Sequence, residues 1–326
     1  MRLKNGTRQN NPVIDKVLYD FSISIVIPVY NSEKSLPELF SKLNEILPAI
    51  VSEFEVILVN DGSRDKSWQV IEELSKEYVW LRGICLMRNY GQHNALLCGI
   101  RAAQNEVIVT IDDDLQHPPE EMPKLLDKFV EGYDVVYGAP EKESHSFLRN
   151  IASQMTKIIL QNAMGADTAR HLGAFRVFHT YLREGFENYQ GTYVSIDVLL
   201  TWSTTKFTHV FVKHYPRTFG QSNYTLRKLV SHAFNMITGF STLPLRFASF
   251  MGFLFTLFGF GVLIYVIVRY IYSGGSVPGF PFLAASIAIF SGAQLFTLGI
   301  IGEYLARIYT RTMNRPSYQV RNQTKQ

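Results

Sequence analysis

Two long stretches without a charged residue constrain the fold of this chain more than any other feature. The first runs from Phe247 to Val268 and the second from Pro281 to Gly302, and each is 22 residues long. An α-helix needs about 20 residues to cross the hydrocarbon core of a membrane. A buried core helix is the competing interpretation, but two such stretches in succession favour a two-helix transmembrane hairpin over residues 247–309.

Basic residues flank this hairpin at both of its outer ends. They precede the first stretch and follow the second, Arg246 and Arg311 among them, whereas the connecting loop at 273–280 has no charge. The positive-inside rule therefore predicts a two-pass protein of the inner (plasma) membrane with both chain ends in the cytoplasm. Residues 1–21 lack the apolar core of a signal peptide and are predicted to be an N-terminal arm.

Two further segments complete the predicted division of the chain. Residues 225–246 mix apolar and basic side chains, which is typical of amphipathic helices in the membrane interface; an ordinary soluble helix pair is the alternative. Residues 310–326 are predicted to form a cytoplasmic basic tail. The two spans account for much of the 47% hydrophobic content, and a net charge of +4 gives no reason to expect a nucleic-acid partner.

The remaining part, residues 22–224, alternates between β-type and α-type patterns. Short apolar runs at 22–29, 55–59 and 106–111 are typical of buried strands, and apolar residues at helical spacing lie between them. This alternation predicts an α/β domain with a mostly parallel sheet and flanking helices. Cys85 and Cys98 have no metal-type spacing and are predicted to be free core thiols.

Three adjacent carboxylates, Asp112, Asp113 and Asp114, directly follow the apolar run at 106–111. In parallel sheets, ligands bind beyond the carboxyl ends of the strands. Adjacent carboxylates repel one another, and a divalent cation such as Mg²⁺ or Mn²⁺ would offset that repulsion while bridging to substrate phosphates. Alternatively, these Asp residues cap the helix that follows Pro118, but a cap requires one Asp and not three.

Five motifs, in their order and spacing, carry a resemblance to a known family. IVIPVYN, VNDGSRD, RNYGQHNAL and IDDDLQHPPEE resemble the family 2 glycosyltransferases, which have the Rossmann-like GT-A fold. PRTFGQSNYTLRKL, followed by two spans, is similar to the polyprenyl-phosphate branch. That branch includes dolichol-phosphate mannose synthases, GtrB-type enzymes and undecaprenyl-phosphate 4-deoxy-4-formamido-L-arabinose transferases.

The resemblance implies a metal-dependent enzyme that moves one sugar, with inversion, from a nucleotide sugar to a polyprenyl phosphate of the undecaprenyl type. A UDP-sugar is the favoured donor, membrane lipid is a partner, and a homo-oligomer such as a tetramer is expected. The donor-site residues that it implies are Pro28, Tyr30, Asn31, Asp61, Arg88, Asp112 and Asp113. Among them, Asp61 matches the carboxylate that contacts the base.

The resemblance also implies a metal site and an acceptor site. Asp112, Asp114 and Gln116 are assigned to the metal, and Asp112 and Asp114 are counted with the catalytic residues. The acceptor phosphate is assigned to Arg217, Ser222 and Arg176, with Arg217 also counted as catalytic because a guanidinium would hold the nucleophile.

The chain departs from the family pattern at three positions. Ala174 stands where many relatives have an Asp, which leaves Asp197 as a substitute base or as a buried structural residue. Asn223 replaces a Lys, and Ser32 replaces a Glu that is present one place later as Glu33.

Two other functions stay open at this point. A processive polysaccharide synthase would carry a QxxRW motif, which is absent, and more spans. A degenerate membrane scaffold would be consistent with Ala174 but not with the intact acidic cluster. His93 and His117 flank the cluster, and we expect His93 to begin a helix and His117 to lie in a turn.

Overall fold

The protein is described by a computed structural model that covers residues 19–140, 164, 168–191, 193–216, 242–272, 279–313 and 315–324. Its residues form two compact units, which are treated separately below. The first unit combines Met1–Leu229 with Arg315–Gln326, and the second is Val230–Asn314.

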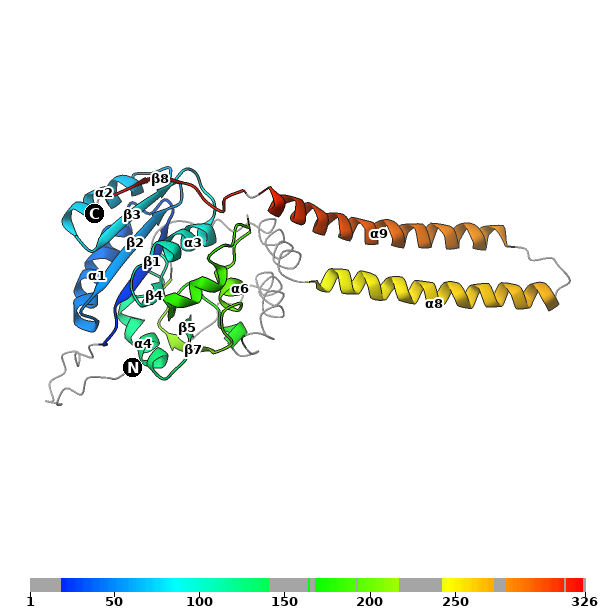
Figure 1. Cartoon of the computed structure of the whole chain (residues 1–326), viewed down its shortest axis with the longest axis horizontal. Helices are drawn as coiled ribbons and strands as arrows, with labels where there is room; N and C mark the ends of the chain where they lie inside the picture. Colours follow the sequence, from blue (N-terminus) through cyan, green and yellow to red (C-terminus); the bar gives the residue numbers. More distant parts are fainter. Residues whose placement is uncertain are drawn as a thin grey trace. The chain divides into compact units, whose positions relative to one another are not determined.

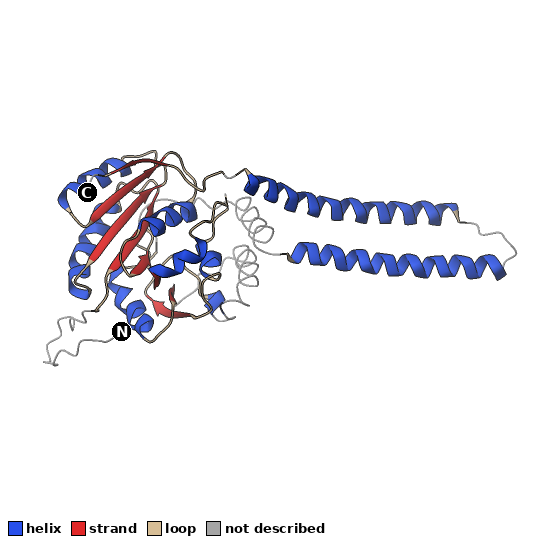
Figure 2. Ribbon diagram, in the orientation of Figure 1, coloured by secondary structure: helices blue, strands red, loops and turns tan. Residues whose placement is uncertain are grey.

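Among the described residues, the first unit contains all the strands and the shorter helices (Figures 1 and 2). The strands are β1 (Ile23–Val29), β2 (Phe54–Asn60), β3 (Leu81–Leu86), β4 (Val107–Thr110), β5 (Val135–Pro140), β6 (Arg176–His179), β7 (Phe207–Val212) and β8 (Val320–Gln323). The helices are α1 (Leu36–Ile50), α2 (Ser67–Glu77), α3 (Gln92–Ala102), α4 (Met122–Val130) and α6 (Ile196–Leu200), with 3₁₀ turns η1 (Pro119–Glu121), η2 (Thr168–Arg170) and η3 (Thr180–Phe186).

The strands form one sheet in the order β7-β5-β6-β4-β1-β2-β3-β8. Strand β1 pairs in parallel with β2 and with β4, and β2 pairs in parallel with β3. Strand β6 runs antiparallel between β4 and β5, and β8 runs antiparallel to β3. The predicted fold, a mostly parallel sheet with flanking helices, is confirmed.

Burial explains why the central elements form. Every residue of β1 and of β4 is buried, as expected for parallel strands covered on both faces. Helix α1 buries one apolar face, which includes Leu39, Phe40 and Leu43. Helix α3 is buried from Asn94 to Ile100 and packs on β1 and β2. Cys85 and Cys98 are free and buried, as predicted.

Part of the segment after the second long helix, predicted as a basic tail over residues 310–326, forms a strand. This strand, β8, adds an edge to the sheet of the first unit and is not among the predicted elements. Backbone hydrogen bonds from Met87 N to Gln319 O (2.9 Å) and from Thr324 N to Gly83 O (3.0 Å) fix the ends of this pairing. The Ser317 hydroxyl also donates to Gly191 O (2.9 Å).

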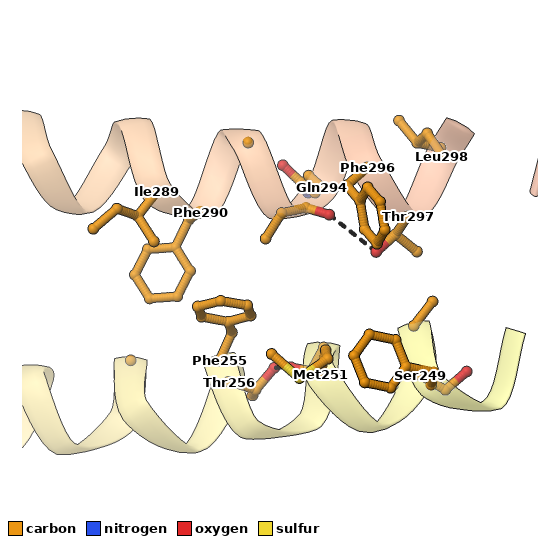
Figure 3. Close-up of a pocket in the computed structure, with 16 residues that line it drawn as sticks. Ser249, Met251, Phe255, Thr256, Ile289, Phe290, Gln294, Phe296, Thr297 and Leu298 are labelled. Atoms are coloured by element: carbon orange, nitrogen blue, oxygen red, sulfur yellow. Dashed lines mark hydrogen bonds between the residues drawn. The ribbon is translucent and has the colours of Figure 1, made fainter. Parts of the chain in front are cut away.

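The second unit contains α8 (Leu243–Tyr272) and α9 (Phe280–Thr312), and both are long and apolar enough to cross a membrane. A cavity of about 910 Å³ lies between them (Figure 3). Phe255 and Phe290 approach edge to face inside it, with ring centroids 6.0 Å apart. Of the predicted interface helices at 225–246, residues 225–241 lie outside the described part of the chain.

The close packing of α3 on β1 depends on Gly99. A Cβ atom at this position would lie 2.3 Å from Val26 Cγ1. We therefore expect Gly99→Ala to lower the free energy of unfolding by about 1–3 kcal/mol, although Ala favours helices. Thermal unfolding of the purified protein in detergent measures the change. In a Val26→Ala background the same substitution should cost less, and an equal cost in both backgrounds would contradict the proposed overlap.

Candidate functional site

The acidic turn Asp112–Asp114 lies at the carboxyl end of β4, near the middle of the sheet. Strands β1, β2 and β3 run parallel to β4, so the loops that follow them open at the same edge. Asp114 is buried, and Leu115 next to it has a positive φ of 60°, which is uncommon for a residue other than glycine. The loops that follow β1, β2 and β3 therefore lie at the same edge of the sheet as the acidic turn.

Each of the three carboxylates in the acidic turn accepts a hydrogen bond from a different residue. Asp113 Oδ2 accepts from the Tyr30 backbone N–H (3.2 Å) and from the Ser32 hydroxyl. Asp112 Oδ1 accepts from the side-chain amide of Gln92 (2.6 Å). Asp113 thus fastens the acidic turn to the loop after β1.

Within the turn itself, Asp114 Oδ1 accepts from the Gln116 backbone N–H (3.1 Å). Ser32 and Gln92 were not among the residues predicted to contact the turn. The sequence offered two indications of these contacts: Ser32 directly follows Tyr30 and Asn31, and Gln92 lies inside the motif RNYGQHNAL.

The oxygen atoms of the acidic turn suit a hard divalent cation as ligands. Asp112 and Asp114 supply carboxylate oxygens, and the Gln116 side-chain amide donates from Nε2 to Tyr215 O (3.4 Å), so its Oε1 is the atom suited to a cation. No group of three or more His, Cys, Asp or Glu within the described residues could hold a metal ion. A cation here would take its remaining ligands from phosphate or water, as Mg²⁺ commonly does.

Asp61, predicted to contact the base, lies buried beneath the loop after β3. Its Oδ1 accepts from the Tyr90 backbone N–H (2.7 Å) and its Oδ2 from the Gly91 N–H (2.8 Å). Burial raises the pKa of this carboxyl group, and the two amide hydrogen bonds act in the opposite direction. The observed contacts give Asp61 a loop-ordering role, and the base contact stays a prediction.

The loops after β1 and β2 are bonded to each other. Asn31 has a positive φ of 56°; its backbone N–H donates to Ser63 Oγ (3.0 Å), and its side chain accepts from the Arg64 N–H (2.8 Å). Gly62 also has a positive φ, of 64°, and a Cβ there would lie 2.5 Å from the backbone of Arg88. Only glycine suits this approach.

Other predicted donor residues lie at the same edge of the sheet. Pro28 belongs to β1, and Tyr30 follows the end of that strand. The Arg88 guanidinium lies over the Tyr90 ring, 4.7 Å from its centroid. The structure therefore brings the predicted donor-site residues to the loops that surround the acidic turn.

Arg176 and Asp197 are bonded to each other. Arg176 Nη1 lies 2.9 Å from Asp197 Oδ1, and the Tyr137 hydroxyl donates to the same oxygen (3.0 Å). The Arg176 side chain is 2% exposed, so its charge depends on this partner. These contacts favour the structural alternative for Asp197, while its role as a base and that of Arg176 in acceptor binding stay predictions.

The two histidines that flank the acidic cluster in the sequence are held in different ways. His93 lies in the first turn of α3, and its Nδ1 accepts from the Ile196 backbone N–H (3.3 Å). The ring of His117 packs against those of Phe175 and His214. Burial, with a smaller contribution from His214, lowers the pKa of His117 to about 4, so its imidazole is neutral at pH 7.

The segment assigned to the acceptor begins beside the acidic turn. Tyr215 N donates to Gln116 O (2.8 Å), and Arg217 follows two residues later. Arg217, Ser222 and Asn223 themselves lie outside the described residues.

Comparison with known proteins decides the family. Residues 24–189, half of the chain, match the family described as Glycosyl transferase family 2. The chain belongs to glycosyl transferase family 2. Membership of this family supports the activity of a nucleotide-sugar glycosyltransferase.

Solved structures of glucosyl-3-phosphoglycerate synthase from Mycobacterium tuberculosis are similar to this family 2 chain in fold. One, in complex with Mn²⁺, UDP and glucosyl-3-phosphoglycerate, is 16% identical with a TM-score of 0.51, and the match covers 67% of this chain and 78% of that chain. Another, with Mn²⁺, UDP-glucose and phosphoglyceric acid, is 16% identical with a TM-score of 0.50 and the same coverage of both chains.

The ion pair between buried Arg176 and half-buried Asp197 predicts an effect on stability. Asp197→Ala should lower the free energy of unfolding by about 3–5 kcal/mol, because it leaves the Arg176 charge buried without its partner. The double variant Arg176→Met/Asp197→Leu should recover much of that loss, because it removes both charges. Chemical denaturation measures both values, and a double variant no more stable than Asp197→Ala would contradict the pairing.

The contacts of Asp61 predict a local effect. Asp61→Ala removes the acceptors of two half-buried N–H groups, so hydrogen exchange at Tyr90 and Gly91 should accelerate roughly 5- to 150-fold, and Asp61→Asn should have a smaller effect. Hydrogen–deuterium exchange measured by mass spectrometry tests this, with the exposed Glu77→Gln as the control. Unchanged protection of the loop in Asp61→Ala would show that other contacts order it.

Proposed function

We propose that this family 2 enzyme transfers a single sugar from a UDP-sugar, with a divalent cation, to a polyprenyl phosphate of the undecaprenyl type. One observation carries the proposal: the chain combines an acidic turn at the carboxyl end of β4 with two membrane-length apolar helices. A lipid-linked acceptor accounts for both features, because such a substrate requires a catalytic site and a membrane anchor in the same chain. The similar synthases, solved with Mn²⁺ and UDP or UDP-glucose, support the choice of donor and cation.

Asp112, Asp114 and Gln116 are the residues that would hold the cation, Mg²⁺ or Mn²⁺. When bound, a divalent ion neutralises the charge that develops on the leaving diphosphate. Asp113 holds the loop after β1 against the acidic turn through Tyr30 and Ser32, which fixes the two sides of the donor site in advance.

The acceptor chemistry needs no strong general base. The nucleophile is a phosphate monoester with a second pKa of about 6, so it is already anionic at neutral pH. This is consistent with Ala174, whose side chain cannot take a proton and whose carbonyl oxygen accepts from the Thr110 hydroxyl (2.6 Å). Direct attack by the phosphate inverts the configuration at the anomeric carbon.

Binding of the acceptor phosphate is assigned to Arg217 and Ser222. The hydrogen bond between Tyr215 and Gln116 supports this, because it holds the chain two residues before Arg217 beside the end of the acidic turn. We further propose that the catalytic unit and both chain ends are cytoplasmic, that residues 225–246 lie in the membrane interface, and that the enzyme assembles as a homo-oligomer.

Transfer assays with purified protein, undecaprenyl phosphate, Mn²⁺ or Mg²⁺ and a panel of UDP-sugars test this function. We expect one product with a single added sugar. Asp114→Asn should reduce transfer by roughly 100-fold or more, because the turn loses a charged ligand. The exposed Glu131→Gln should leave the rate unchanged. Polymer formation would instead indicate a processive synthase, and binding without transfer for every donor would indicate a scaffold.

A further inference from the structure

Strand β8 lines a cavity in the first unit. The cavity has a volume of about 470 Å³ and lies where β2, β3 and β8 meet. Its lining comes from three parts of the chain that are distant in sequence: Asn60, Gly62 and Ser63 after β2 with Trp68 of α2, residues 85–88 at the end of β3, and Arg321 and Asn322 of β8.

The chemistry of the lining suits a nucleoside. Trp68, Leu86 and Met87 offer apolar and aromatic surface, while Ser63 and Asn322 offer hydrogen-bonding groups. Arg88 and Arg321 add two positive charges, and no carboxylate lines the cavity within the described residues. An arginine can both stack on a base and bond to anionic or carbonyl oxygens.

Arg321 and Asn322 of β8 have hydrogen-bonding groups that no described residue engages. Asn322 Oδ1 accepts from the Gln323 backbone N–H (3.0 Å), and no described residue engages its NH₂ group. Arg321 is exposed, and no hydrogen bond or ion pair to its guanidinium occurs among the described residues. Asn60 differs, because its amide already donates to Cys85 Sγ (3.3 Å) and accepts from the Ser63 N–H (3.3 Å).

The cavity lies at a suitable distance from the acidic turn. Three strand intervals separate β4 from β3 in the order β4-β1-β2-β3. Neighbouring strands lie about 4.8 Å apart, so these intervals amount to about 14 Å. A nucleoside diphosphate in an extended conformation is of comparable length, so a diphosphate at Asp112 and Asp114 would bring its nucleoside to the cavity.

We propose that Arg321 and Asn322 of β8 bind the nucleoside end of the donor and that β8 thereby completes the donor site. The inference rests on the proposed function, since it takes the donor to be a nucleoside diphosphate sugar. Asn322 donates to the base or ribose through its NH₂ group, and the Arg321 guanidinium contacts the base. A segment that follows the second membrane-length helix thus sets donor affinity.

Calorimetric titration of the full-length protein with UDP and Mn²⁺ tests this proposal. We expect Asn322→Ala to raise the dissociation constant of UDP about 3- to 10-fold and Arg321→Ala about tenfold, as for the loss of neutral and charged hydrogen bonds. Arg321→Lys should fall between, because Lys keeps the charge but not the planar group. Gln323→Ala on the same strand and Lys76→Ala on α2 are the matched controls, and both should bind UDP like the unmodified protein.

A second titration, with inorganic diphosphate and Mn²⁺, separates the two ends of the donor. Neither variant should change the affinity for diphosphate, and an equal loss for UDP and diphosphate would overturn the assignment to the nucleoside. Unchanged UDP affinity in both variants would overturn the proposal while leaving the proposed function intact. Failure of the unmodified protein to bind any nucleoside diphosphate would instead refute the proposed function. Because both side chains are exposed, thermal unfolding should be unchanged in the variants.

Discussion

Strand β1 pairs in parallel with β2 on one side and with β4 on the other, and this pairing fixes the carboxyl ends of all three strands at one edge. The polar loops that follow the strands must then share a small volume. Their mutual hydrogen bonds, from Asn31 to the loop after β2 and from Tyr30 to the acidic turn, are a consequence of that pairing. The site is therefore a property of the sheet and not of any one motif.

The acidic turn illustrates how such a sheet tolerates adjacent carboxylates. Each of the three accepts at least one hydrogen bond, and each bond comes from a different part of the chain or turn. Hydrogen bonds to a carboxylate favour its charged form, which offsets part of the repulsion before any cation binds. The remaining repulsion is what a divalent ion with phosphate ligands would relieve.

Much of the fold could be predicted because β1, β2 and β4 are continuous apolar runs bounded by polar turns. Strands β6 and β8 could not, because neither is an apolar run: the RVFH of β6 begins and ends with a polar residue, and the VRNQ of β8 contains one apolar side chain. Within the site, Asp112–Asp114 could be located because three adjacent carboxylates directly follow a predicted strand. The partners Ser32 and Gln92, and the burial of Asp61 under two amides, depend on which loops the sheet brings together, and a linear sequence does not carry that information.

The position of β8 in the chain has a consequence for biosynthesis. The ribosome makes this strand only after both long apolar helices, so β3 remains an unpaired edge while α8 and α9 are synthesised. Unpaired edges are templates for pairing with other chains, and domains generally begin to fold as soon as they emerge. The sheet of the first unit must therefore persist with an unpaired β3 edge during synthesis. Pairing of β8 with β3 can occur only after both long helices have been made.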